Sequence, residues 1–336
     1  MANISVIGAG SWGTALAAVL ANNAHQVNVW SIIPEEVEML NTFHEHKQKL
    51  PGVPIPEQIT FTTDLTASVR GKDMLVLATP SPFVRSTAKA MAGNVADGQL
   101  IVVVAKGIEE SSLKIMTDVV SDEIPQAVAA VLSGPSHAEE VSRGLPTTVV
   151  AGAASREVAE TIQEYFMNEV FRVYTSPDML GIELGASLKN VIALAAGMAD
   201  GLGFGDNTKA ALITRGIKEI SDLGLKMGAY PETLSGLSGI GDLIVTCASK
   251  HSRNRRAGML IGQGYSMQEA MDAVQMVVEG VYSAKAAAAL AQKYNVNMPI
   301  VNEVNAVLFG GKTAKQSVTD LMLRGKKSEN EELKWE

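Results

Sequence analysis

A glycine-rich turn near the N-terminus has the spacing of a dinucleotide-binding fingerprint. Residues 8–13 read GAGSWG, a G-x-G-x-x-G pattern that follows the apolar run 4–7 and precedes an alanine-rich stretch. In this pattern Gly8 permits the tight turn, Gly10 lets a pyrophosphate approach the backbone, and Gly13 lets the helix pack close to the strand. The N-terminus of that helix also offers free N–H groups to the phosphates. A glycine turn without a ligand is the alternative, but a strand, turn and helix in register favour a dinucleotide site.

The residues after the second predicted strand leave the choice of dinucleotide open. An acid at this point usually binds the ribose hydroxyls of NAD, whereas an arginine accepts the 2′-phosphate of NADP. Here Ser31, Ile32 and Ile33 follow the strand, and Glu35 comes only after Pro34. Because neither charge is in place, the sequence predicts a cofactor that is NAD or NADP, with modest discrimination between them.

A single lysine stands out in the second half of the chain. Lys189 is the only charged residue between Leu184 and Ala199, and Asn190 adds a neutral polar group beside it. Burial on an apolar helix would lower the pKa of the amine toward the range of a general acid or base. The alternative is a lysine that packs its stem in the helix and extends its amine to solvent. The pattern alone favours neither.

A basic cluster follows further along. Residues 250–256 read KHSRNRR, with four cations in seven residues. Ser252 and Asn254 lie between the cations, an arrangement typical of a phosphate site in which Arg253 would bind the anion. A solvated helix face is the commoner explanation for such a run.

Two other motifs lack residues that a metal site or a hydrolase would need. The stretch 137–140, HAEE, lacks the second histidine of a zinc-binding helix, and Ser136 beside His137 lacks the sequence of a nucleophile elbow. Neither a metal site nor hydrolysis is therefore predicted.

Composition narrows the class of protein. The chain of 336 residues has a net charge of −8, which argues against general nucleic-acid binding. The lone cysteine, Cys247, excludes a disulfide within the chain and a Cys-based zinc site, and it fits a reducing cytoplasm. No signal peptide is evident, and no segment is expected to span a membrane.

The elements that would position these residues alternate in the first half. Short apolar runs predict strands at residues 4–7, 26–30, 74–78, 100–105, 129–132 and 147–151. Strands that alternate with helical stretches favour an α/β fold with a Rossmann-type doubly wound parallel sheet, whose ligands bind at the carboxyl ends of the strands. After about residue 178 the composition predicts an all-helical C-terminal domain. We expect residues 1–180 to form the dinucleotide-binding domain and residues 181–336 to form a helical substrate-binding and catalytic domain.

Taken together, the motifs resemble those of bacterial-type NAD(P)-dependent glycerol-3-phosphate dehydrogenase. Besides GAGSWG, the matching segments are VAKGIE at 104–109, SGPSHAEE at 133–140, LKNVIA at 188–193, GMADGLGFGDNT at 197–208, LSGIGD at 237–242, SRNRRAG at 252–258 and VEG at 278–280. They span nearly the whole chain in the order of the family. The resemblance is therefore much more specific than the fingerprint alone.

The resemblance implies interconversion of sn-glycerol 3-phosphate and dihydroxyacetone phosphate by hydride transfer with NAD(P), without a metal, in the supply of glycerol 3-phosphate for phospholipid synthesis. It implies that Lys189 is the catalytic proton acceptor. The substrate-binding residues it implies are Lys106, Gly134, Ser136, Lys189, Asp242, Ser252, Arg253 and Asn254. The cofactor-binding residues, with the fingerprint included, are Gly8, Gly10, Ser11, Trp12, Gly13, Lys106, Ala138, Arg253, Val277 and Glu279.

Two other functions are weighed beside this one. A related two-domain dehydrogenase acting on a 2-hydroxy acid or sugar acid would use the Arg253 cluster to bind a carboxylate. A non-catalytic dinucleotide sensor would bind the cofactor without turnover and would not need Lys189. The expected partner is a small phosphorylated substrate, and the oligomeric state is left open, with a homodimer as one option.

Overall fold

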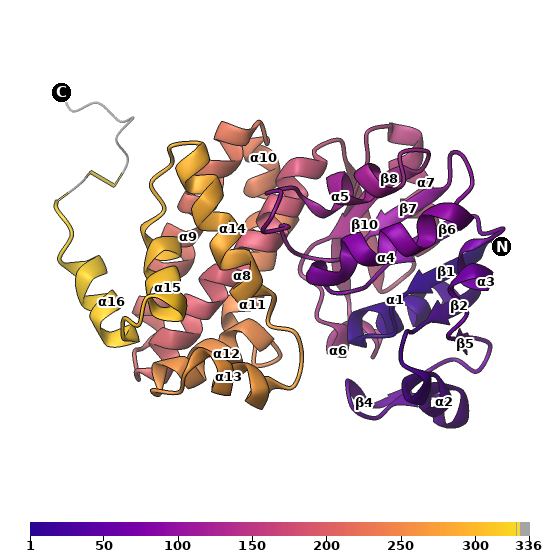
Figure 1. Cartoon of the computed structure of the whole chain (residues 1–336), viewed down its shortest axis with the longest axis horizontal. Helices are drawn as coiled ribbons and strands as arrows, with labels where there is room; N and C mark the ends of the chain where they lie inside the picture. Colours follow the sequence, from indigo (N-terminus) through magenta and orange to yellow (C-terminus); the bar gives the residue numbers. More distant parts are fainter. Residues whose placement is uncertain (327, 330–336) are drawn as a thin grey trace.

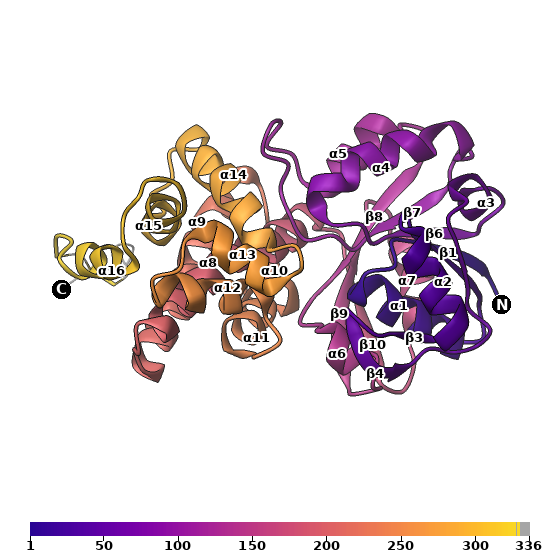
Figure 2. The same ribbon diagram turned by 60° about the horizontal axis from the view of Figure 1, so that its bottom comes forward.

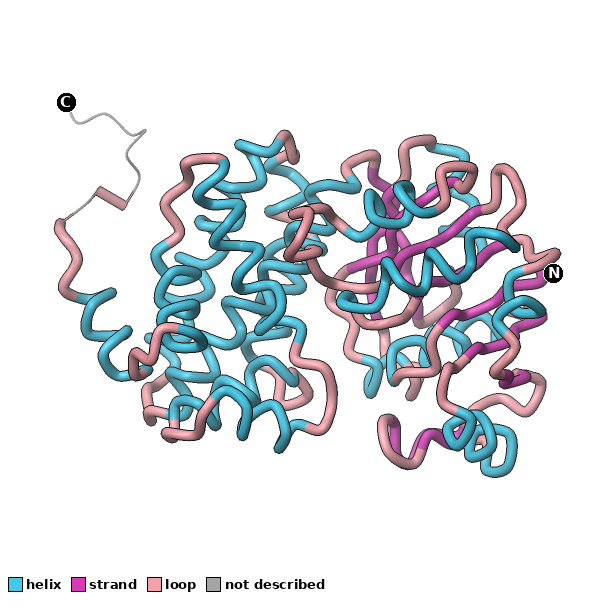
Figure 3. The backbone as a smooth tube through the Cα atoms, in the orientation of Figure 1, coloured by secondary structure: helices cyan, strands magenta, loops and turns pink. Residues whose placement is uncertain are grey.

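The computed structural model describes residues 1–326, 328 and 329. A sheet flanked by helices occupies the N-terminal half, and a bundle of helices occupies the rest (Figures 1 and 3). The predicted α/β fold followed by an all-helical part is confirmed. The predicted helical domain runs to residue 336, but residue 327 and residues 330–336 lie outside the described residues.

Within the described residues the main sheet has eight strands, in the order β10-β9-β8-β7-β6-β1-β2-β5. Their bounds are β1 Asn3–Ile7, β2 Gln26–Trp30, β5 Thr60–Thr62, β6 Met74–Leu77, β7 Leu100–Val103, β8 Val128–Ser133, β9 Thr147–Gly152 and β10 Phe171–Ser176. β9 pairs antiparallel to β8, so β9 and β10 run against the other strands and the sheet is mixed rather than wholly parallel. A separate hairpin joins β3 (Glu45–His46) to β4 (Leu50–Pro54).

Helices cover both faces of the sheet because its central strands are apolar on both sides. One face packs against α1 (Ser11–Asn22) and α7 (Arg156–Phe166), and the other packs against α4 (Val84–Met91) and α5 (Met116–Glu123). Figure 2 shows α4 and α5 on the side of the sheet opposite to α1 and α7. The remaining helices of this half are α2 (Pro34–Phe43), α3 (Leu65–Val69), α6 (Ala138–Val141) and the 3₁₀ turns Ser81–Phe83 and Ala92–Asn94.

From α8 onward the described chain forms helices without strands. The bounds are α8 Met179–Gly201, α9 Asp206–Met227, α10 Pro231–Leu234, a π-helical turn Leu237–Gly241, α11 Asp242–Ala248, α12 Arg253–Gly262, α13 Met267–Val274, α14 Glu279–Lys293, α15 Pro299–Phe309 and α16 Ala314–Met322. By length and composition α8 resembles a membrane-spanning helix, yet 83% of its apolar window is buried. It is the central helix of this half.

Glycines bring α8 and α12 into backbone contact. A Cβ added to Gly197 on α8 would lie 2.1 Å from the carbonyl oxygen of Arg255 on α12. A Cβ added to Gly258 on α12 would lie 2.2 Å from the carbonyl oxygen of Leu194 on α8. Real side chains do not tolerate such distances, so this crossing depends on glycine at both positions.

Candidate active site

The fingerprint turn lies where the strand order reverses. β1 is flanked by β2 and β6, so the chain leaves β1 in one direction and later returns on the other side, which is the usual place for a ligand in an open α/β sheet. Gly8 has φ +124°, and a Cβ there would lie 2.9 Å from the carbonyl group of Ala78 after β6. A Cβ on Gly13 would lie 2.0 Å from the carbonyl oxygen of Gly8. A side chain at either Gly8 or Gly13 would therefore clash with the backbone, so the turn needs glycine at both positions.

Gly10 differs from Gly8 and Gly13 because a Cβ at Gly10 would meet nothing within 4 Å. It precedes Ser11 and Trp12 in the first turn of α1, whose N-terminus has no side-chain cap. The indole Nε1 of Trp12 is buried and has no hydrogen-bond partner among the described residues. Open space, uncapped N–H groups and an unpaired donor together fit the pyrophosphate of a dinucleotide.

Charged residues do stand beside the end of β2, contrary to the prediction from the local sequence. Glu36 is buried, and its carboxylate accepts hydrogen bonds from Ser31 Oγ at 2.5 Å, from His46 Nε2 at 2.9 Å and from Lys49 Nζ. Burial raises the pKa of the Glu36 carboxyl, but the hydrogen bonds from His46, Lys49 and Ser31 outweigh that effect and lower the pKa to about 2. The β3–β4 hairpin delivers His46 and Lys49, so no pattern near β2 could have revealed them.

The second half of the site is built around one carboxylate and two lysines. Lys189 Nζ donates to Asp242 Oδ1 at 2.5 Å, and Lys106 Nζ donates to Asp242 Oδ2 at 2.9 Å. Lys189 is 5% exposed and Asp242 is 1% exposed, which rules out the alternative of an amine that extends to solvent. Three elements far apart in sequence supply these groups: α8, the N-terminus of α11, and the loop after β7.

Burial sets the proton affinity of Lys189. It lowers the pKa of the ammonium to about 7, with Asp242 opposing that effect and Lys106 adding to it. Burial also disfavours the charged form of Asp242, but Lys106 and Lys189 outweigh this and hold the pKa of its carboxyl below the usual value. One carboxylate that is shared by two amines leaves one cation in excess. The more deeply buried amine, Lys189, is therefore suited to exchange a proton near neutral pH.

Neighbouring polar groups orient the lysine. Thr246 Oγ1 lies 2.8 Å from Lys189 Nζ and donates to the carbonyl oxygen of Asp242 at 2.6 Å, one turn back on α11. Asn190 donates to the carbonyl oxygen of Ala186 at 3.3 Å, and its Oδ1 accepts from Asn254 at 2.9 Å. The π-helical turn that leads into Asp242 is of the kind often found at functional sites.

The loop after β8 closes the site from the side of the sheet. Gly134 has φ +143°, and its carbonyl oxygen accepts from Lys106 Nζ at 3.0 Å and from Ser136 Oγ at 2.9 Å. Ala138 begins α6 directly after this loop. The predicted substrate residues Lys106, Gly134 and Ser136 are thus brought together with Lys189 and Asp242.

The basic cluster separates into different roles. Arg255 forms an ion pair with Asp200 at 2.6 Å, and Lys250 and Arg256 are exposed. Ser252 Oγ accepts from the backbone N–H of Arg255 and so caps α12. Of the four cations, Arg253 is the one that, within the described part of the chain, donates a hydrogen bond to another predicted residue, at the carbonyl oxygen of Val277, so Arg253 stays the candidate for binding an anion.

Arg253 and Glu279 connect the helical half to the cofactor side. Arg253 Nη1 donates a long bond of 3.4 Å to the carbonyl oxygen of Val277, and Asn254 Oδ1 accepts from the N–H of Gly280 at 2.8 Å. Glu279 accepts from the N–H of Ser81 at 3.1 Å and from its hydroxyl. Burial raises the pKa of the Glu279 carboxyl, although the hydrogen bonds from Ser81 and the charge of Arg253 oppose the shift.

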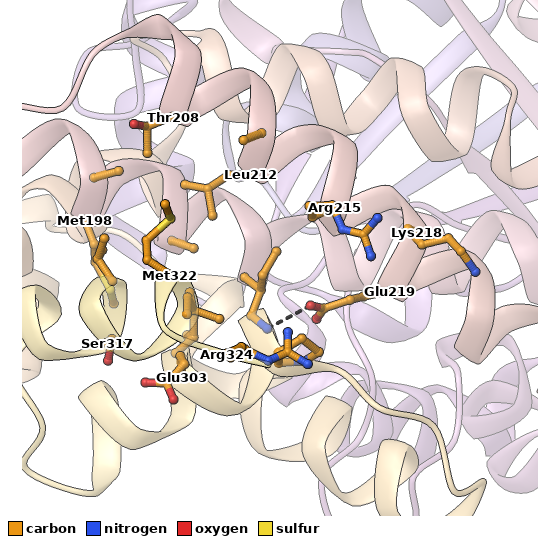
Figure 4. A pocket seen from close by; sticks show the side chains of 18 of the residues that line it. Met198, Thr208, Leu212, Arg215, Lys218, Glu219, Glu303, Ser317, Met322 and Arg324 are labelled. Atoms are coloured by element: carbon orange, nitrogen blue, oxygen red, sulfur yellow. Dashed lines mark hydrogen bonds between the residues drawn. The ribbon is translucent and has the colours of Figure 1, made fainter. Parts of the chain in front are cut away.

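A cavity of about 580 Å³ lies elsewhere, between α8, α9, α15 and α16, and none of the predicted site residues lines it (Figure 4). Its polar wall includes Glu219, which accepts from the backbone N–H of Ile300 at 2.8 Å and of Val301 at 3.3 Å. Burial raises the pKa of the Glu219 carboxyl to about 7. The described residues contain no group of three or more His, Cys, Asp or Glu that could hold a metal ion.

Comparisons with known proteins identify the family of the chain. Residues 3–159 match the N-terminal domain family of NAD-dependent glycerol-3-phosphate dehydrogenase, and residues 178–319 match the corresponding C-terminal domain family. The chain is 67% identical to a glycerol-3-phosphate dehydrogenase (NAD(P)+) of Agathobacter rectalis over 100% of both chains. It is 48% identical to the protein of that name from Bacillus subtilis over 99% of this chain and 97% of the relative. A crystal structure of glycerol-3-phosphate dehydrogenase from Coxiella burnetii superimposes with a TM-score of 0.93 at 37% identity, covering 96% of this chain and 99% of that one.

Proposed function

The chain belongs to the NAD(P)-dependent glycerol-3-phosphate dehydrogenases, and from that premise we propose which of its residues carry the reaction. It interconverts sn-glycerol 3-phosphate and dihydroxyacetone phosphate, with a role in phospholipid synthesis. The observation that carries the assignment of residues is the buried Lys189 beside Asp242, at the end of a sheet whose first turn fits a dinucleotide.

Lys189 is the proton acceptor for the alcohol. In oxidation the neutral amine takes the proton of the C2 hydroxyl, and in reduction the ammonium returns it to the carbonyl oxygen at C2. The bound nicotinamide accepts or supplies the hydride at C2. Asp242 and Thr246 hold the amine in place, and a pKa of about 7 makes both protonation states available near neutral pH.

The phosphate of the substrate binds between Arg253 and Lys106. Arg253 begins α12, so its guanidinium and the free N–H groups of that helix can bind the same anion. Lys106 supplies a second positive charge. The side chains of Ser252 and Asn254 already have partners, and each keeps one further donor for a phosphate oxygen. Gly134 and Ser136 line the same side through their loop.

The cofactor binds across the fingerprint turn. Gly10 and the N-terminus of α1, together with Ser11 and Trp12, would hold the pyrophosphate. Ala138, Val277 and Glu279 would contact the cofactor, together with Lys106 and Arg253. Lys49 and Glu36 stand where the adenosine ribose would lie, so Lys49 would meet the 2′-phosphate of NADP. The presence of both charges supports use of either dinucleotide.

The organisation of the protein completes the proposal. The proposed boundary at residues 180 and 181 falls in the first turn of α8, close to the change from the sheet to the helices between Ser176 and Met179. The dehydrogenase works in the cytoplasm, where its substrate and cofactor are small soluble molecules, with a homodimer as one option for its assembly.

The test follows the absorbance of the reduced nicotinamide with the purified protein and dihydroxyacetone phosphate. Oxidation of NADH or NADPH that depends on this substrate supports the proposal. Unphosphorylated dihydroxyacetone and 2-oxo acids serve as comparison substrates. Faster turnover of a 2-oxo acid would favour the related hydroxy-acid dehydrogenase, and binding of cofactor without turnover of any substrate would favour a sensor.

A further inference from the structure

Besides Trp12 Nε1, another buried polar atom at the site has no hydrogen-bond partner among the described residues. The Nε2 atom of His137 is buried and makes no hydrogen bond with any described residue. His137 lies between Ser136, proposed to contact the substrate, and Ala138, proposed to contact the cofactor. A buried polar group without a partner is unfavourable, so a native site usually supplies a partner, which can be a ligand.

The neighbours of His137 place it on the substrate side. Lys189, Lys106, Asp242 and Glu139 are near enough to affect its titration. Its ring lies 6.0 Å from that of His251, which immediately precedes the cap of α12. The imidazole therefore stands between the loop after β8 and the start of α12, the two segments proposed to hold the substrate.

The His137 imidazole is suited to bind an uncharged group of a ligand. Burial lowers the pKa of the imidazole, Lys189 and Lys106 lower it further, and Glu139 and Asp242 oppose the change, with a net decrease. The ring is therefore neutral at pH 7 and offers one donor and one acceptor. A neutral imidazole contributes little to binding a phosphate, but it can hydrogen-bond a hydroxyl.

The substrate has one hydroxyl that the proposed machinery leaves unbound. Dihydroxyacetone phosphate carries a phosphate, a reacting carbonyl and a C1 hydroxyl. The other neutral groups around Lys189 are already engaged: Thr246 with Lys189 and Asp242, Asn190 with Ala186 and Asn254, and Ser136 with Gly134. Building on the proposed function, we infer that His137 Nε2 hydrogen-bonds the C1 hydroxyl and makes His137 a specificity-determining residue for the hydroxymethyl end of the substrate.

The experiment compares dihydroxyacetone phosphate with hydroxyacetone phosphate, which lacks only the C1 hydroxyl. The unmodified enzyme should prefer dihydroxyacetone phosphate by about tenfold to a hundredfold in kcat/KM, the effect of leaving a buried polar group unpaired. In His137→Phe, kcat/KM for dihydroxyacetone phosphate should fall by a similar factor. Its value for hydroxyacetone phosphate should stay within about twofold of the unmodified enzyme, so that the preference disappears.

Two further variants separate recognition from packing. His137→Gln places an amide near the position of Nε2 and should keep most of the preference. His251→Phe removes the neighbouring imidazole and should leave the preference unchanged. The inference is overturned if His137→Phe slows both substrates equally, or if it changes only KM for the nicotinamide cofactor. It is also overturned, without any variant, if the unmodified enzyme does not distinguish the two substrates. Failure to reduce either ketone would instead contradict the proposed function.

Discussion

Replacing Lys189 by methionine should separate catalysis from stability. The methionine side chain fills a similar volume but cannot exchange a proton, so kcat should fall by at least about 100-fold, the lower end for general acid–base catalysis. Cofactor affinity should be nearly unchanged, because Lys189 lies on α8 and the pyrophosphate site lies on α1. Asp242 keeps its hydrogen bond to Lys106 at 2.9 Å and is therefore not left as an unpaired buried charge.

The same replacement should stabilise the folded protein in a pH-dependent way. The pKa of Lys189 falls from 10.5 to about 7 on folding, so burial of its charge costs at most about 5 kcal/mol. Below pH 7 both folded and unfolded chains hold the proton and the full cost applies. Between pH 7 and 10.5 only the unfolded chain holds it, so the stability of the unmodified protein rises with pH. The advantage of the methionine variant should therefore be larger at pH 6 than at pH 9.

Urea unfolding followed by circular dichroism at the two pH values gives the stabilities, and oxidation of NADH or NADPH gives kcat. Lys209→Met is the matched control, because Lys209 is a half-buried lysine paired with Asp200 at 3.0 Å and lies outside the proposed machinery. Its kcat should stay near that of the unmodified protein. Near-normal turnover in folded Lys189→Met would remove Lys189 from the mechanism. A stability difference that does not depend on pH would refute the argument from its burial.

Three shorter predictions test other parts of the molecule. Arg253→Ala should raise KM for dihydroxyacetone phosphate and abolish discrimination against unphosphorylated dihydroxyacetone; intact discrimination would place the phosphate elsewhere, with Lys106 the next candidate. Lys49→Ala should lower kcat/KM for NADPH about 10- to 100-fold, the value of a charge-assisted hydrogen bond, with NADH little affected; equal losses in the exposed control Lys47→Ala would argue against a specific contact. Because folding raises the pKa of Glu219 from 4.5 to about 7, stability is lost as pH rises through that range, by at most about 3 kcal/mol. In urea unfolding, the free energy of unfolding of Glu219→Gln should therefore increase relative to that of the unmodified protein as pH rises from 4.5 to 8. A difference between the two proteins that does not change with pH would contradict this.

Local sequence patterns predicted most strands of the main sheet but not its edge strands or the direction of β9. The six predicted strands are present with small shifts at their ends, and the central ones, β1, β6 and β7, are apolar runs that are almost wholly buried. β10 was missed although its residues alternate between buried and exposed, the pattern of a half-covered strand. β5 has three residues, too few for any periodicity to be visible. The antiparallel direction of β9 likewise depends on its connection and not on its composition.

In the candidate site, too, features set by neighbouring residues could be predicted and contacts between distant elements could not. The fingerprint follows from neighbouring residues, so the sequence could predict it. For Lys189 the local pattern left burial and extension to solvent equally open, and only the structure decides between them. The partners could not be predicted, since Asp242 and Lys106 meet Lys189 from distant elements. Nor does the charge run after residue 250 show by itself that an acid on α8, Asp200, pairs with Arg255. Lys49 reaches the end of β2 only through the hairpin.

The glycine contact between α8 and α12 also fixes how two proposed parts of the site lie relative to each other. Lys189 lies about two turns before Gly197 on one helix, and Arg253 begins the other helix, before Gly258. Because backbone touches backbone at the crossing, the distance between the two helices depends on these glycines and not on adjustable side chains. A side chain at either glycine would force the helices apart, and with them the proposed proton acceptor and the proposed phosphate-binding residue. The crossing thus acts on the arrangement of the proposed site from a distance.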